Sequence, residues 1–223
     1  MEALNSFDML LKLVLFQGMS SRDMAQVIEH TKFGFHKFLP GRPFITSGET
    51  VDQLWFLLDG HIISTALSDD GTYAVMEHLP GPYLIEPERI FGLTQRFSHS
   101  YRTAVPCSFI TLDKAEVMNL SDEFLIFRLN LLNYISTQLQ KCTHRAWQSK
   151  PQHLEHRIIR FFESHSLRPA GEKHFKIKMV RLADELNDSR LNISAALNSL
   201  QDKGLINLRR GLIDIPALEK LLM

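Results

Sequence analysis

The side chains best suited to specific chemistry lie between residues 189 and 199. Arg190, Asn192 and Asn198 are interspersed with small or apolar residues, and no acidic residue occurs from position 189 to position 201. Arginine can donate two hydrogen bonds to guanine, and asparagine can form two with adenine, in the major groove of DNA. A face without acid is also compatible with negatively charged phosphates. This pattern predicts a DNA-reading surface formed by Ser189, Arg190, Asn192, Ser194 and Asn198.

Two further basic residues, Arg209 and Arg210, lie between the alternating apolar stretches 205–208 and 212–215. Alternation around a short polar turn is typical of a hairpin. Phosphate contacts from such a turn would add affinity that does not depend on the DNA sequence. We therefore predict that both arginines bind the DNA backbone.

Two short amphipathic helices joined by a polar turn would position the DNA-reading residues. The first has an apolar stripe at helical spacing, formed by Leu182, Ala183 and Leu186. Asn187 tolerates the left-handed conformation that ends a helix, and Asp188 or Ser189 can cap the next one. The second helix would bury Ile193, Leu197 and Leu200. Residues 151–223 are thus predicted to form a winged helix-turn-helix domain.

The N-terminal half changes from helical to strand-like periodicity. Residues 3–32 have helical spacing, with a helix start at Ser20–Asp23. Short alternating stretches separated by turn signals follow at 33–39, 42–45, 53–58, 61–67, 73–79 and 102–112. This spacing predicts a small antiparallel barrel or sandwich within residues 1–120.

A long helix is expected at 121–150, beginning with Ser121 as its cap. Its apolar residues recur every seven positions or in the alternate positions of a coiled-coil seam, at Leu125, Leu132, Ile135, Leu139, Cys142 and Ala146. A second stripe would pack the helix on its own domain, through Phe127, Leu131 and Tyr134. The seam predicts a homodimer. The alternative, a helix buried within a monomer, leaves the seam unexplained.

These features together resemble a known family. Gly48-Glu49, residues 54–60, Asp70-Gly71 and Pro80-Gly81, followed by a long helix and a winged helix-turn-helix, resemble the cAMP receptor protein/Fnr superfamily of bacterial transcription regulators. The resemblance spans nearly the whole chain. It implies an α+β protein with an N-terminal double-stranded β-helix (a cyclic-nucleotide-binding-like jelly roll), a dimerisation helix, a palindromic DNA site and RNA polymerase as a partner.

The segment that holds the phosphate in cyclic-nucleotide-binding relatives is altered here. Glu86 matches the family pattern, but Ile85 replaces the preceding glycine and Pro87 removes a backbone donor. Arg96 lies about one residue away from the position of the phosphate-binding arginine in those relatives. Glu86 and Arg96 are the candidate effector-binding residues, although these changes argue against a cyclic nucleotide. His99 could ligate haem, but we favour a surface loop histidine.

Composition narrows the remaining function classes. The 223 residues carry 25 basic and 25 acidic side chains, and only the tail from Pro151 onward has a basic excess, twelve against nine. Two cysteines and no membrane-length apolar stretch fit a cytoplasmic protein. His144, His153 and His156 near Cys142 are interpreted as surface residues, so no metal site is expected. Without a recognisable catalytic motif, we expect no enzyme activity.

Two hypotheses therefore remain. The first is a dimeric transcription regulator controlled by an unidentified small-molecule or redox effector. The second is an effector-binding module whose degenerate helix-turn-helix contacts proteins, because Ala195 stands where the family's usual recognition-helix arginine is expected.

Overall fold

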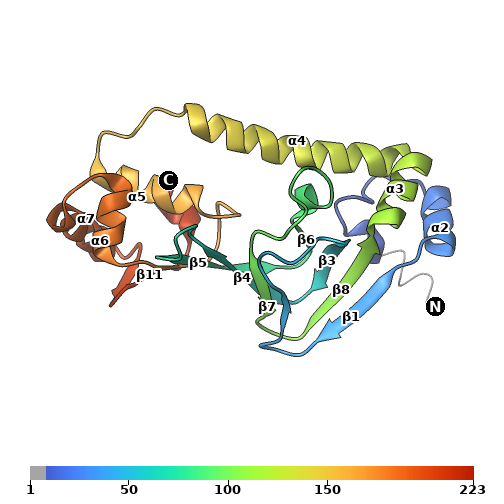
Figure 1. Cartoon of the computed structure of the whole chain (residues 1–223), viewed down its shortest axis with the longest axis horizontal. Coiled ribbons are helices and arrows are strands. Elements are labelled where there is room, and N and C mark those ends of the chain that lie inside the picture. The colour runs from blue at the N-terminus through green and yellow to red at the C-terminus, as the bar shows by residue number, and fades with distance from the viewer. Residues whose placement is uncertain (1–8) are drawn as a thin grey trace. The chain divides into compact units, whose positions relative to one another are not determined.

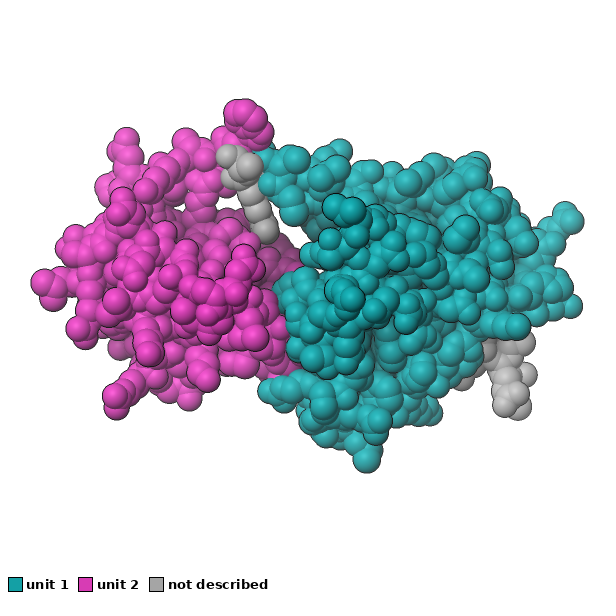
Figure 2. Space-filling model, in the orientation of Figure 1, with its two compact units in different colours: residues 1–62, 79–146 teal, residues 63–78, 147–223 magenta. Residues whose placement is uncertain are grey.

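A computed structural model describes residues 9–223, except the side chains of Arg145 and Ala146. The chain forms two compact units (Figure 2), one of residues 1–62 and 79–146 and one of residues 63–78 and 147–223. Part of the expected N-terminal helical stretch, residues 3–8, and the seam position Ala146 lie outside this description. The division at residues 120 and 150 stays a prediction.

The first unit is built on antiparallel strands (Figure 1). One four-stranded sheet has the order β1-β8-β3-β6, and β2 pairs with β7. These strands are β1 (Gly34–Phe38), β2 (Pro43–Ile45), β3 (Gln53–Asp59), β6 (Tyr83–Ile85), β7 (Ser100–Thr103) and β8 (Cys107–Asp113). Both faces of β3 and β8 are buried, since consecutive residues are buried on each strand, Leu54, Trp55 and Phe56 on β3 and residues 109–112 on β8. This strand arrangement confirms the predicted small antiparallel barrel or sandwich, which we call the roll.

Two details of the strands differ from the sequence-based expectation. The single strand expected at 102–112 is instead two strands, separated at residues 104–106. Pro106 has no backbone N–H to donate, which favours a break in strand pairing there. The short strand β6 was not predicted, because its three residues give too little alternation.

The first unit also contains the helices α2 (Ser21–His30) and α3 (Lys114–Glu123) and nearly all of α4 (Leu125–Trp147). The Ser20 hydroxyl accepts the Asp23 N–H at 3.1 Å, so the predicted start of α2 is confirmed. The expected start of the long helix at Ser121 is wrong. Ser121 lies within α3, where its hydroxyl donates to the Val117 carbonyl, and α4 begins after the extended residue Phe124.

Helix α4 has two different faces. Phe127 and Leu131 are buried against the roll, and the Asn130 side chain donates to the carbonyl oxygens of Leu15 and Gln17. The predicted seam residues are instead open to solvent, with exposed fractions of 56% for Leu125, 54% for Leu132 and 63% for Leu139. Ile135 is half-buried. One stripe therefore belongs to the core of the unit, whereas Leu125, Leu132 and Leu139 of the other are exposed among the described residues.

The second unit contains the C-terminal helices and a sheet. Its helices are α5 (Leu154–Ser164), α6 (Met179–Leu186) and α7 (Arg190–Asp202), and its C-terminal strands are β9 (Lys173–Lys176), β10 (Asn207–Arg209) and β11 (Leu212–Ile215). Their core includes Ile158, Phe162, Phe175, Leu182, Ile193 and Leu197. These elements form the predicted winged helix-turn-helix.

Residues 63–78 add a hairpin to this unit, formed by β4 (His61–Leu67) and β5 (Ala74–Pro80). Strand β5 pairs antiparallel with β9, from Ala74 opposite Lys176 to Glu77 opposite Lys173. The Lys173 ammonium lies 2.8 Å from the Glu77 carboxylate, with 0% and 2% of these side chains exposed. A buried ion pair therefore joins the hairpin to the C-terminal sheet.

No helix among the described residues combines the length and apolar character needed to cross a membrane.

Candidate functional site

The turn between α6 and α7 has the predicted local structure. Asn187 ends α6 in the left-handed conformation, with φ of 49°, and its N–H donates to the Asp184 carbonyl. Ser189 caps α7, because its hydroxyl accepts the N–H of Asn192 at 3.1 Å. These caps satisfy backbone groups that the helix ends would otherwise leave without partners. Asn187 and Ser189 thereby fix where α6 ends and where α7 begins.

Helix α7 has a buried side and an open side. Ile193, Ala196, Leu197 and Leu200 are buried, whereas Arg190, Leu191, Asn192, Ala195 and Asn198 are exposed and Ser194 is half-buried. The predicted DNA-reading residues thus share one helix, and Ser189 has a structural role as its cap. Whether they contact DNA stays a prediction.

One of these residues is already paired within the chain. The Asn192 side-chain amide donates to Asp188 at 2.8 Å, and the same carboxylate accepts the Ser189 N–H and the Arg157 guanidinium. Hydrogen bonds from Asn192, Ser189 and Arg157 hold the pKa of Asp188 below its usual value. Asp188 therefore stays charged at neutral pH and holds one of the two N–H donors of the Asn192 amide.

The two wing arginines have different surroundings. Arg210 and Gly211 form the turn between β10 and β11, and Arg210 is exposed. Arg209 instead donates to Asp214 on β11, with its Nε 2.8 Å from the carboxylate. Burial alone would raise the pKa of Asp214, but hydrogen bonds from His174 and Arg209 outweigh it and lower the pKa. Arg210 is thus better placed than Arg209 for a phosphate contact.

Sequence reasoning missed Asp188 and Asp214 as partners of the predicted site residues. The Asp188–Asn192 spacing of four residues was a visible signal, because such side chains are neighbours across a helix start. The pairing of Arg209 with Asp214 depends on the hairpin register, in which Asn207 faces Asp214. The sequence alone did not predict this register, because it depends on which residues form the turn between β10 and β11.

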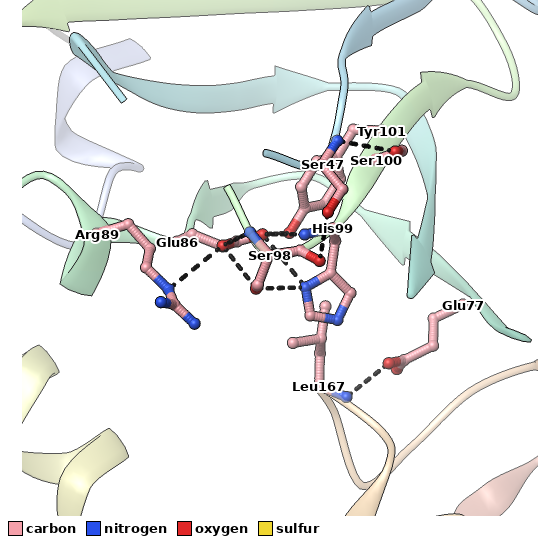
Figure 3. A network of polar contacts seen from close by, with 9 residues as sticks. All are labelled: Ser47, Glu77, Glu86, Arg89, Ser98, His99, Ser100, Tyr101 and Leu167. Atoms are coloured by element: carbon pink, nitrogen blue, oxygen red, sulfur yellow. Dashed lines mark hydrogen bonds and ion pairs between the residues drawn. The ribbon is translucent and has the colours of Figure 1, made fainter. Parts of the chain in front are cut away.

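The candidate effector segment centres on Glu86, whose side chain is buried in a polar network (Figure 3). Its carboxylate accepts from the Ser98 N–H and hydroxyl at 2.7 and 2.8 Å, the His99 N–H at 3.0 Å and the Tyr101 hydroxyl at 2.9 Å. The Arg89 Nε lies 3.8 Å from a Glu86 carboxylate oxygen. Burial would raise the pKa of Glu86, but hydrogen bonds from His99 and Ser98 outweigh it, so the pKa is lowered. Both carboxylate oxygens are therefore occupied by groups of the chain itself.

Arg96 and His99 lie in the same segment but have different contacts. Arg96 is exposed and donates to the Gly48 carbonyl at 2.7 Å. The His99 ring lies 3.2 Å from Glu86 and 2.8 Å from the Ser98 hydroxyl through Nδ1. Its side chain is only 17% exposed, so His99 is a network residue rather than an open surface histidine. The roles of Glu86 and Arg96 toward an effector stay predictions.

Sequence comparison gives partial relatives. No protein-family model matches the chain. A segment of 127 residues is 28% identical to the potassium channel SKOR of Arabidopsis thaliana, and 129 residues are 27% identical to the potassium channel KOR1 of Oryza sativa subsp. japonica. Each match covers 55% of this chain and 14% of the channel. The chain thus spans about a seventh of the length of these curated relatives.

Solved structures match over much more of the chain. The catabolite activator protein of Thermus thermophilus has a TM-score of 0.52 and 16% identity, over 94% of this chain and 96% of that one. The c-di-GMP responsive global regulator CLP of Xanthomonas campestris has a TM-score of 0.52 and 15% identity, over 88% and 99%.

A third match concerns the sensor part alone. The sensor domain of the transcriptional regulator DNR of Pseudomonas aeruginosa has a TM-score of 0.54 and 16% identity, over 69% of this chain and 99% of that one. The names of these three proteins describe an activator and two regulators. The chain has the fold of full-length Crp/Fnr transcription regulators.

Proposed function

We propose that the protein is a dimeric, sequence-specific DNA-binding transcription regulator of the Crp/Fnr type. The observation that carries this proposal is the open side of α7, where Arg190 and Asn198 are exposed on a helix that is capped, packed on its inner side and free of acid through residue 201. A helix of this kind can enter the major groove, because its outer side chains are short or able to pair with base edges. From the resemblance to Crp/Fnr regulators we also propose a cytoplasmic location and RNA polymerase as a partner.

Mutations separate base reading from phosphate binding. We expect Arg190→Ala to cost about 1 to 3 kcal/mol on a preferred site and to relax the preference at one position per half-site. Arg210→Ala should instead weaken binding to all duplexes and reduce the salt slope by roughly one unit per lost contact. Fluorescence anisotropy at several salt concentrations measures both effects.

Arg22→Ala is the matched control, because Arg22 is an exposed arginine on α2 in the other unit. It should bind like the unmodified protein. If Arg190→Ala and Arg210→Ala changed specificity and salt dependence alike, the assignment of base reading to α7 would be wrong.

The open stripe of α4 supports the dimer part of the proposal. At about 100° per residue, Leu132 lies about 140° around the helix from the buried Phe127, so the seam faces away from the unit's own core. Burying each large apolar side chain of the seam would contribute roughly 1.5 to 3 kcal/mol. A second copy presents the same stripe, so a two-fold pairing of α4 would cover both.

Sedimentation tests this pairing. We expect the unmodified protein to be a dimer at micromolar concentration and Leu132→Asp to shift it to monomer, because a carboxylate in the seam would lose its hydration. Thr137→Asp is the control, since Thr137 is exposed on α4 about 140° from Leu132. An unmodified protein that sediments as a monomer, or a dimer insensitive to Leu132→Asp, would contradict the coiled-coil proposal.

The effector in this proposal is an unidentified small molecule or redox signal rather than a cyclic nucleotide. Glu86 already accepts hydrogen bonds from Ser98, His99 and Tyr101, so a nucleotide would have to displace groups of the chain itself. Calorimetry with cAMP and cGMP should show no binding below millimolar concentration. Submillimolar affinity that Arg96→Ala abolishes would contradict this expectation.

A degenerate helix-turn-helix used for protein contacts is the second candidate function. The pairing of Asn192 with Asp188 and of Arg209 with Asp214 favours it, because both side chains are held by acids of the same chain. Under this alternative, neither Arg190→Ala nor Arg210→Ala would alter affinity for any duplex.

A further inference from the structure

Three side chains with metal-binding atoms converge in the second unit. His78 lies on β5, Glu172 directly precedes β9, and His174 lies on β9. Their ligand atoms all lie within 4.8 Å of one another. The side chains are 33%, 47% and 20% exposed, so an ion from solvent can reach them.

The distances between these atoms are close to those of a coordination sphere. His174 Nε2 lies 3.2 Å from a Glu172 oxygen, and His78 Nε2 lies 4.0 Å from the other oxygen. Tetrahedral zinc with bonds of about 2.0 to 2.2 Å holds its ligand atoms roughly 3.3 to 3.5 Å apart. The first distance fits directly, and the other pairs, all within 4.8 Å, reach this spacing with side-chain movements of about 1 to 1.5 Å.

A carboxylate behind His174 completes the arrangement. Asp214 on β11 lies 2.6 Å from His174 Nδ1, and its other oxygen binds Arg209. A histidine that donates Nδ1–H to a carboxylate has its Nε2 lone pair free for a metal and is a stronger ligand. Asp214 is therefore a positioning residue that directs Nε2 of His174 toward Glu172.

With His174 in the tautomer that donates from Nδ1 to Asp214, a metal ion would satisfy both His174 Nε2 and the Glu172 oxygen. A neutral imidazole that donates from Nδ1 to Asp214 presents a lone pair at Nε2, and the Glu172 oxygen 3.2 Å away presents another. Two acceptors at this distance repel each other unless a proton or a metal ion lies between them. A proton would join only His174 Nε2 and the Glu172 oxygen, whereas a metal ion could also be bound by His78.

We propose that His78, Glu172 and His174 bind a divalent transition-metal ion of the zinc class, with water in the remaining position. Two imidazole nitrogens and one carboxylate are a ligand set suited to zinc, and three protein ligands leave an open position. The ion would link β5 to β9, which pair in the sheet but are separated by about a hundred residues of sequence. Through Asp214 it would also be coupled to the position of Arg209.

Metal titration of the full-length protein tests this site. After removal of metal with a chelator, calorimetry with ZnCl₂ should show one ion per chain, and CoCl₂ should give the visible absorption of tetrahedral cobalt. His78→Ala and His174→Ala should each weaken zinc binding at least tenfold. Asp214→Asn should weaken it about 10 to 100-fold, although Asp214 does not touch the ion.

The control is the triple variant Cys142→Ser/His153→Ala/His156→Ala, because His153 and His156 form another histidine pair, with ring centroids 5.8 Å apart, and Cys142 is an exposed thiol. It should bind zinc like the unmodified protein. Circular dichroism of the metal-free variants separates loss of the site from loss of the fold, and Glu172→Gln at the exposed ligand tests the site with little change in packing.

Three outcomes would overturn the proposal. The first is the absence of stoichiometric zinc binding in the unmodified protein, which would leave a proton between His174 and Glu172. The second is full affinity in a folded His78→Ala or Glu172→Gln variant. The third is loss of binding in the triple control variant, which would place the ion at Cys142, His153 or His156.

Discussion

Glu86 has φ of 37° and ψ of 53°, a left-handed conformation that a non-glycine residue rarely adopts. The surrounding network holds it there, since Ser98, His99 and Tyr101 all donate to its carboxylate. A buried carboxylate is tolerated only with this degree of hydrogen bonding. The residue that matches the family pattern therefore acts as an internal acceptor in this chain.

Glu86→Gln should destabilise the first unit by about 1 to 3 kcal/mol at pH 7, because the amide N–H₂ would face backbone donors. The pKa of Glu86 in the folded protein lies below its ordinary value of 4.5, so the carboxylate stabilises the fold fully above that pH. The stabilisation is lost as the pH falls through the lowered value. Denaturant unfolding between pH 3 and pH 7 should show the deficit of the variant shrinking with acid.

Glu123→Gln is the control for this experiment, because Glu123 is exposed at the end of α3. It should leave the unfolding free energy nearly unchanged at every pH. A deficit of Glu86→Gln that is constant from pH 3 to pH 7 would show that packing, rather than charge, accounts for the role of Glu86.

At the scale of elements, the turn of the helix-turn-helix depends on Asn187. This residue adopts the left-handed conformation, which costs roughly 1 to 2 kcal/mol for residues other than glycine and less for asparagine. We expect Asn187→Ala to destabilise the second unit by about 1 kcal/mol and Asn187→Gly to be neutral or stabilising. Thermal unfolding measures both, and equal effects of alanine and glycine would contradict the conformational explanation.

Local elements were the part of the fold that sequence reasoning predicted best. The caps at Ser20 and Asn187 are short-range interactions that their residue types predicted, whereas the sequence left Asp188 and Ser189 open as the cap of α7 and the structure has Ser189 there. The start of α4 was misplaced because Ser121, Asp122 and Glu123 have the composition of a helix start but lie at the end of α3. Phe124 is extended and separates the two helices, and no local signal distinguished this interruption from the expected cap.

At the scale of the whole molecule, the assignment of residues 63–78 to the second unit was not predictable. It depends on the pairing of β5 with β9 and on the contact of Glu77 with Lys173, which lie 96 positions apart. Neither residue stands out in the sequence, because lysine and glutamate are usually exposed. For the same reason, the sequence did not predict that His78 lies close to Glu172 and His174.

Lys173→Met tests the contribution of the buried ion pair. Removing the ammonium leaves Glu77 buried with the N–H groups of Leu167 (Figure 3) and Arg168 as its remaining donors. We expect a loss of roughly 3 to 5 kcal/mol in the second unit, and substantial recovery in Lys173→Met/Glu77→Leu, because an apolar pair has no unpaired charge. Chemical denaturation measures both variants. A double variant no more stable than the single one would contradict this explanation.

Selection of duplexes from a random DNA pool at physiological salt tests the central claim most directly. A dimer that presents two copies of α7 should enrich an inverted repeat with half-site centres about one helical turn, or 10 to 10.5 base pairs, apart. Arg190→Ala should relax one position in each half-site while Arg22→Ala leaves the selected sequence unchanged. A pool without an enriched half-site, or a repeat that is the same for Arg190→Ala, would contradict DNA reading by α7.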